Sequence, residues 1–210
     1  MKEEFAKLYK KILSCPSAKE CDKKAGGHRC GLIDPGYLGP KYKKGGILVV
    51  GLNPGCPKEK KNSLAELSFK KIMEMLKEKM KGWEIWKNMN KVGLEPLFNR
   101  IPEIAYTNLV KCAWYEKDGK KNKTNLPDDI FKSCKDYLKK QVDILDPKVV
   151  IFLGKKTFDK AQELYKSDES MQKYLKYYIY HPSRMVNYKK KNTKGKAEKQ
   201  VKEVLRVIGR

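Results

Sequence analysis

Polar side chains that could carry out hydrogen-bond and proton-transfer chemistry stand at the ends of three predicted strands: Asn53, Asn108 and His181. An asparagine amide offers both a donor and an acceptor, and a histidine ring can donate to negative charge that develops during a reaction. The carboxyl ends of parallel strands meet at one edge of a sheet, where open α/β folds bind their ligands. We therefore expect these three side chains to share one cleft.

The turn around Asn53 has a composition suited to close contact with a ligand. Its sequence is Gly51-Leu52-Asn53-Pro54-Gly55, in which the glycines permit positive φ and the proline fixes its own φ. Asn53 is the only side chain of this turn with both donor and acceptor atoms. The alternative is a structural turn in which the asparagine has no chemical role.

Alternating apolar and amphipathic segments predict the sheet that would position these residues. Buried strands are expected at Ile47–Val50, Ile104–Lys111, Val149–Gly154 and Tyr177–Tyr180. Helices are expected at Glu3–Leu13, Leu64–Lys81, Asp128–Ile144, Lys156–Tyr165 and Ala197–Ile208. Strands that alternate with helices are typical of a three-layer α/β/α sandwich around a mostly parallel sheet, here with four strands. We expect a single domain over residues 1–210.

The chain carries a strong excess of positive charge. It contains 48 Lys and Arg against 25 Asp and Glu, which gives a formal net charge of +23. Such an excess predicts a polyanionic partner, nucleic acid before membrane. The alternative is the Lys- and Glu-rich surface of thermophile proteins, but such surfaces usually balance the two signs. We recognise no signal peptide and no apolar run of about 18 residues, so we expect an intracellular, cytoplasmic protein.

Six cysteines in a reducing compartment favour metal ligation over disulfides. Cys15 follows the first predicted helix, and Cys21 and Cys30 lie in a segment of about residues 15–40 that lacks hydrophobic periodicity. A loop of this length buries little surface by itself, so we expect its cysteines to fix it to the rest of the domain.

Several of these motifs resemble those of the uracil-DNA glycosylase superfamily. Gly51–Gly55 and His181-Pro182-Ser183 resemble its two signatures, and the first looks most like the mismatch-specific and single-strand-selective branches. The rest is similar to the iron–sulfur (family 4-like) branch in Tyr106–Cys112, in Cys134 on a helix and in Asp146–Gly154. The resemblance covers about residues 5–208, with the motifs in matching order.

The resemblance implies a role for each residue of the cleft. Asn53 would hold the attacking water, His181 would donate to uracil O2, and Asn108 would pair with N3–H and O4 of the flipped base. The base pocket would also include Gly51, Leu52 and Ser183. A strand-end cap is the alternative role for Asn108.

Residues after the second signature would contact DNA. Arg184 or Met185 would fill the space that the flipped base leaves, although Arg184 could equally contact a phosphate. Lys189 and Lys190 would follow the DNA backbone, the alternative being a solvated run of charge. The aromatic residue that stacks on the base in this family has no clear counterpart, because Pro57–Ser68 contains none. Phe69, Tyr37, Tyr42 and Leu64 are the substitutes that we consider.

The resemblance also implies a metal site. Cys112 and Cys134 match the later pair of cluster ligands, and Cys15 and Cys30 fit the earlier pair best, with Cys21 as the alternate for either. Four thiolates can hold a [4Fe–4S] cluster or a structural zinc ion, and the resemblance favours the cluster.

Together these features predict a monomeric, monofunctional DNA glycosylase that excises uracil, and other deaminated bases, in base-excision repair. One alternative is a catalytically silent nucleic-acid-binding protein that retains the fold and the cluster. Another is a hydrolase that acts on RNA or nucleotides through the same pocket.

Overall fold

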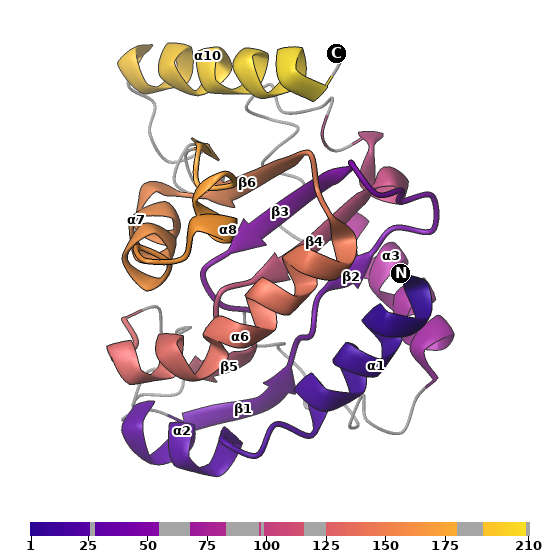
Figure 1. Ribbon diagram of the computed structural model, residues 1–210, viewed down its shortest axis with the longest axis vertical. Helices are drawn as coiled ribbons and strands as arrows, with labels where there is room; N and C mark the ends of the chain where they lie inside the picture. Colours follow the sequence, from indigo (N-terminus) through magenta and orange to yellow (C-terminus); the bar gives the residue numbers. More distant parts are fainter. Residues whose placement is uncertain are drawn as a thin grey trace.

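The computed structural model describes residues 1–25, 28–54, 68–82, 97, 99–115, 125–179 and 191–208. A five-stranded sheet forms its centre, with the strand order β2-β4-β3-β6-β7 (Figure 1). The strands are β2 (Tyr37–Leu38), β4 (Ile104–Asn108), β3 (Ile47–Gly51), β6 (Val149–Leu153) and β7 (Tyr177–Ile179). The last four are parallel to one another, and β2 is antiparallel to β4.

The middle of this sheet is buried on both faces, because every residue of β3, β4 and β6 is buried. Runs of apolar and β-branched residues suit such strands. The register pairs Ile47 with Ile104 and with Val149, so the three strands start level with one another. Their carboxyl ends consequently reach the same edge of the sheet.

Helices cover the sheet on both faces. They include α1 (Lys2–Leu13), α3 (Phe69–Gly82), α6 (Asp128–Leu145), α7 (Lys155–Leu164), the short α8 (Glu169–Gln172) and α10 (Lys191–Ile208). The connection from β3 to β4 runs in the opposite direction across the sheet from those that lead to β6 and β7. The right-handed crossover rule therefore puts α3 on one face and both α6 and α7 on the other. In Figure 1, α6 lies across the sheet with α1 beside it.

The predicted fold class is confirmed, with antiparallel β2 added at one edge of the four predicted strands. Two residues are too few to show an alternating pattern, so β2 gave no signal. The predicted helix starting at Ala197 begins earlier, at Lys191. The first four residues of the predicted helix Leu64–Lys81, Leu64–Leu67, lie outside the described residues. Within the described segments, we find no helix that has both the length and the apolar character needed to cross a bilayer.

The N-terminal segment differs from the expected loop. It contains α2 (Ala18–Ala25) and β1 (His28–Ile33), and β1 pairs with β5 (Cys112–Tyr115) in a separate antiparallel sheet. The predicted strand Ile104–Lys111 is correspondingly wrong at its end, because β4 stops at Asn108 and the chain turns away to form β5. Both elements depend on partners distant in sequence, which local periodicity does not reveal. In Figure 1 this small sheet lies below the main one.

Candidate functional site

The turn that follows β3 lies against the end of β4. Gly51 and Asn108 are partners in the parallel pair, and the N–H of Leu109 donates to the carbonyl of Gly51 at 2.9 Å. The N–H of Val110 donates to the carbonyl of Leu52 at 3.0 Å. Asn53 follows, partly exposed, with its Nδ2 3.4 Å from the carbonyl of Pro54. The structure thus brings the turn containing Asn53 and the Asn108 side chain to one edge of the sheet.

The side chain of Asn108 is fully buried and hydrogen-bonded at both ends of its amide. Its Nδ2 donates to Asp34 Oδ2 at 3.2 Å, and its Oδ1 accepts from the Tyr106 hydroxyl at 3.0 Å. Sequence reasoning missed both partners. Tyr106 stands two residues before Asn108 on the same strand, and this spacing could have identified it because it puts both side chains on one face. Asp34 comes from the loop after β1, and no sequence signal points to it.

A buried lysine holds the backbone beneath this amide. Lys111 Nζ donates to the carbonyl of Asn108 at 2.5 Å, to Thr107 Oγ1 at 2.7 Å and to Gln141 Oε1 at 2.6 Å. Gln141 lies on α6 and donates through Nε2 to the carbonyl of Pro35 at 2.6 Å. Buried charges are rare unless they are paired and hydrogen-bonded, and here a carboxylate and an ammonium share one network. The network ties the loop after β1, the end of β4 and α6 together.

Burial dominates the electrostatics of this network. It raises the pKa of Asp34, against the opposing effects of the Gly36 N–H, the Lys111 ammonium and the Asn108 amide. It also lowers the pKa of Lys111 to about 8, with Cys134 and Asp34 opposing the change. Burial and the nearby Asp34 raise the pKa of the Tyr106 hydroxyl, so this group keeps its proton and can donate.

Helix α1 approaches the network through Tyr9. Burial and then the charge of Asp34 raise the pKa of the Tyr9 hydroxyl, which has no hydrogen-bond partner among the described residues. The Tyr9 ring packs edge-on against Phe69, with ring centroids 5.4 Å apart. Phe69, a candidate for stacking on a base, is therefore packed against α1. Tyr42, another candidate, is buried and donates to the carbonyl of Leu145 at 3.2 Å, at the other end of the strands.

Four of the candidate metal ligands have described side chains, and all four are thiols: Cys15, Cys21, Cys112 and Cys134. Burial raises the pKa of Cys134 to about 11, Lys111 opposes this rise, and Cys15 and Cys21 add to it. Cys15 and Cys21 therefore lie in the neighbourhood of Cys134. However, no three Cys, His, Asp or Glu side chains in the described part of the chain form a group that could hold a metal ion.

Several predicted site residues lie outside the described residues. They are His181, Ser183, Arg184, Met185, Lys189 and Lys190, together with the side chain of Cys30, whose backbone is part of β1. The strand before His181 does end at the expected edge, since β7 is parallel to β6. The N–H of Gly154, which follows β6, donates to the carbonyl of Ile179, the last residue of β7, at 2.7 Å.

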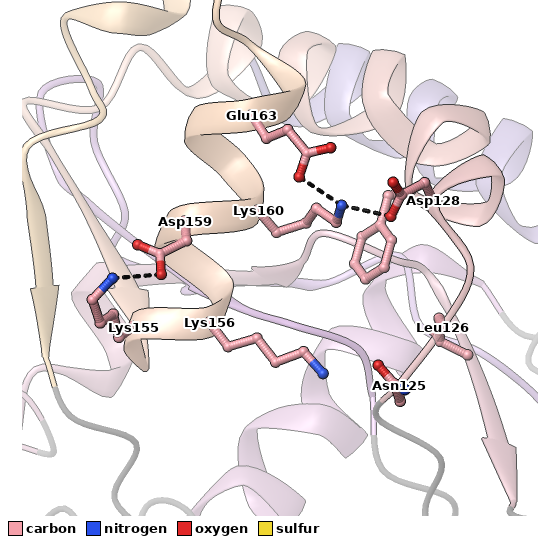
Figure 2. A pocket seen from close by; sticks show the side chains of 9 residues that line it. Asn125, Leu126, Asp128, Lys155, Lys156, Asp159, Lys160 and Glu163 are labelled. Atoms are coloured by element: carbon pink, nitrogen blue, oxygen red, sulfur yellow. Dashed lines mark hydrogen bonds and ion pairs between the residues drawn. The ribbon is translucent and has the colours of Figure 1, made fainter.

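A surface hollow lies between the start of α6 and α7, and it contains no predicted site residue (Figure 2). Lys160 bridges Asp128 at 2.6 Å and Glu163 at 2.7 Å, and Lys155 pairs with Asp159 at 2.6 Å. Carboxylates thus offset the charge of these two lysines, and the hollow does not form a basic patch of the kind that binds phosphate.

Comparison with known families gives a match to the model of the uracil DNA glycosylase superfamily over residues 38–207. A search among curated proteins found no match. The matched region begins at the second residue of β2 and ends in α10, so it contains β3, β4, β6 and β7 with Asn108, whereas Asp34 precedes it. The chain therefore belongs to the uracil DNA glycosylase superfamily.

Proposed function

We propose that this protein is a monofunctional DNA glycosylase that removes uracil, and other deaminated bases, in base-excision repair. Membership of the superfamily supports a DNA glycosylase-like function. The observation that carries the finer proposal is the Asn108 amide beside the Gly51 turn. Asp34 occupies one of the two N–H donors of this amide, and Tyr106 occupies one of its two acceptor positions. Among the contacts of the described residues, one donor and one acceptor of the amide therefore remain. The Watson–Crick edge of uracil presents the matching pair, an N3–H donor and an O4 acceptor.

The proposed reaction is hydrolysis of the N-glycosidic bond. Water adds to C1′ of the deoxyribose, the C1′–N1 electron pair leaves with the base, and negative charge collects on O2. Asn53 holds the water and His181 donates to O2, which stabilises charge present only as the bond breaks. The water's proton finally passes to the departing base through solvent, because a neutral amide does not accept a proton near pH 7. The products are an abasic site and the base.

DNA is the partner that the charge favours. A formal net charge of +23 attracts the phosphate backbone, and superfamily membership supports action on DNA. We assign Arg184 and Met185 to the space left by the flipped base, and Lys189 and Lys190 to the phosphates.

A structural [4Fe–4S] cluster, or a zinc ion in its place, is the cofactor that we propose. Its proposed ligands are Cys15, Cys30, Cys112 and Cys134, with Cys21 as the alternate for Cys15 or Cys30. The soft thiol donors suit either group. Binding requires the thiols to come closer together than the described residues place them.

An excision assay tests this function. Single- and double-stranded oligonucleotides with one uracil are incubated with the protein and then treated with alkali, which cleaves the strand at an abasic site. We expect cleavage with the wild-type protein and a strong loss in Asn108→Ala, Asn53→Ala and His181→Ala. Asn125→Ala is the matched control, since Asn125 is exposed and has no role in the proposed reaction. Salt-sensitive DNA binding without cleavage would instead identify a catalytically silent binding protein.

A further inference from the structure

The Asn108 amide is held in one of its two possible flip orientations. Asp34 Oδ2 faces its Nδ2 at 3.2 Å, and the Tyr106 hydroxyl faces its Oδ1 at 3.0 Å. An ionised carboxylate only accepts hydrogen bonds. Rotating the amide by half a turn would put Oδ1 against this carboxylate and remove the Asp34 hydrogen bond in a fully buried place, where an unpaired polar group is costly.

Asp34 is itself fixed, so it acts as a rigid reference for this orientation. Its Oδ1 accepts the N–H of Gly36 at 2.9 Å, and its own N–H donates to the carbonyl of Lys111 at 2.7 Å. Gly36 has φ +105°, a backbone conformation that residues with a side chain rarely adopt, so this tight turn depends on glycine. Burial raises the pKa of the Asp34 carboxyl, and the Gly36 N–H, the Lys111 ammonium and the Asn108 amide oppose this rise by stabilising the ionised, acceptor form on which the lock depends.

We propose that Asp34 and Tyr106 are positioning residues that lock the Asn108 amide and so decide which bases the pocket accepts. This inference rests on the proposed function. The locked amide suits bases that present a carbonyl beside a ring N–H, as uracil and hypoxanthine do. It opposes bases that present an amino group beside a ring acceptor, as cytosine and adenine do, and the normal DNA bases of this second class are thereby spared.

The substitution Asp34→Asn tests this lock in a specific direction. The N–H of Gly36 needs an oxygen acceptor, so Oδ1 of the new amide stays toward Gly36 and its NH2 faces Asn108. Asn108 then gains from turning its own Oδ1 toward that donor. The flipped amide presents to the base the pattern that complements cytosine. The change replaces one oxygen by nitrogen and preserves side-chain volume.

The measurement is the single-turnover excision rate for uracil and for cytosine at the same position of one oligonucleotide. Cytosine excision can be too slow to detect. In that case, free cytosine and free uracil are compared as inhibitors of uracil excision, and the ratio of the two inhibitory effects gives a second measure of the preference. We expect the preference for uracil to fall about tenfold or more in Asp34→Asn, the effect of one hydrogen bond, and less in Tyr106→Phe. Thr107→Val is the matched control, because Thr107 belongs to the same buried network but bonds Lys111 and Gln141 rather than the amide.

The outcomes separate this inference from the function on which it rests. Lower uracil preference in Asp34→Asn with an unchanged ratio in Thr107→Val supports the lock. Slower uracil excision at an unchanged ratio overturns it and leaves the glycosylase function standing. If Asp34→Asn does not fold, an unchanged ratio in Tyr106→Phe overturns it as well. A wild-type protein that neither excises uracil nor is inhibited by it overturns both proposals.

Discussion

Gly51 and Asn108 are paired across β3 and β4, and Asn108 Oδ1 lies where a Cβ on residue 51 would collide with it. The Tyr106 hydroxyl would also be 2.9 Å from that Cβ. The absence of a side chain at position 51 therefore lets the amide and its tyrosine partner lie directly over the first turn. The glycine of the signature turn is needed here for space rather than for an unusual φ.

The substitution Gly51→Ala should consequently displace the Asn108 amide. We expect a loss of unfolding free energy of about 1–3 kcal/mol from overpacking. We expect uracil excision to slow by about a hundredfold, the scale of a misplaced contact group. Single-turnover kinetics and urea unfolding measure the two effects. Gly195→Ala is the control, since a Cβ there meets nothing within 4 Å inside α10, and it should stabilise the protein slightly. If Gly51→Ala excised uracil at the wild-type rate, the predicted steric clash between residue 51 and the Asn108 amide would be refuted.

Two buried tyrosines should respond differently to loss of their hydroxyl groups. Tyr106 donates to Asn108 at 3.0 Å, whereas the Tyr9 hydroxyl is buried with no hydrogen-bond partner among the described residues. Tyr106→Phe should lower the free energy of unfolding by about 1 kcal/mol. Tyr9→Phe should leave it unchanged or raise it, because it removes an unsatisfied polar group. Urea unfolding of the pair provides the comparison, and an equal loss in both variants would contradict it.

The elements that could be predicted from sequence are those whose burial produces a clear hydrophobic pattern along consecutive residues. Strands β3 and β6 are apolar throughout because both of their faces are covered, and α6 shows a clear apolar stripe. Strand β2 has only two residues, and β1 contains Arg29 and Gly31. Each of these two short strands exists because a distant strand supplies its hydrogen bonds, which one sequence does not show.

The same distinction applies to the site. Asn108 and the Gly51 turn could be found because parallel strands must end at one edge. Asp34 and Gln141 could not, since a buried polar residue looks like any surface residue in a sequence. Their hydrogen bonds span 74 and 106 positions, to Asn108 and Pro35 respectively.

Asp34 should make a characteristic contribution to stability against pH. Burial raises its folded-state pKa above the usual 3.8, so folding favours the protonated form. Its contribution is therefore fully present below pH 3.8 and is lost as the pH rises through the folded pKa. We expect the free energy of unfolding of the wild type, minus that of Asp34→Asn, to fall as the pH increases from about 4 toward 7.

Carboxylates with lowered pKa, such as Asp128 and Asp168, have the opposite dependence but are present in both proteins and cancel in this difference. Urea unfolding at a series of pH values measures it. A difference that stays constant with pH would show that Asp34 titrates as it does in the unfolded chain.

Cysteine substitutions should identify the fourth ligand of the proposed cluster. Cys15 and Cys21 lie near the buried thiol of Cys134, and the backbone of Cys30 lies in β1, which pairs with the strand that contains Cys112. We take the nearness of Cys21 to Cys134 as the basis of the prediction, and we expect Cys21→Ser and Cys134→Ser to lose bound metal and Cys30→Ser to keep it. Cys56→Ser, which changes the cysteine that follows the signature turn in the sequence, is the control and should keep the metal. Iron, sulfide and zinc analysis of the purified proteins measures the effect, and a brown protein distinguishes the cluster from colourless zinc. Metal retained in Cys21→Ser and lost in Cys30→Ser would assign the fourth position to β1 instead.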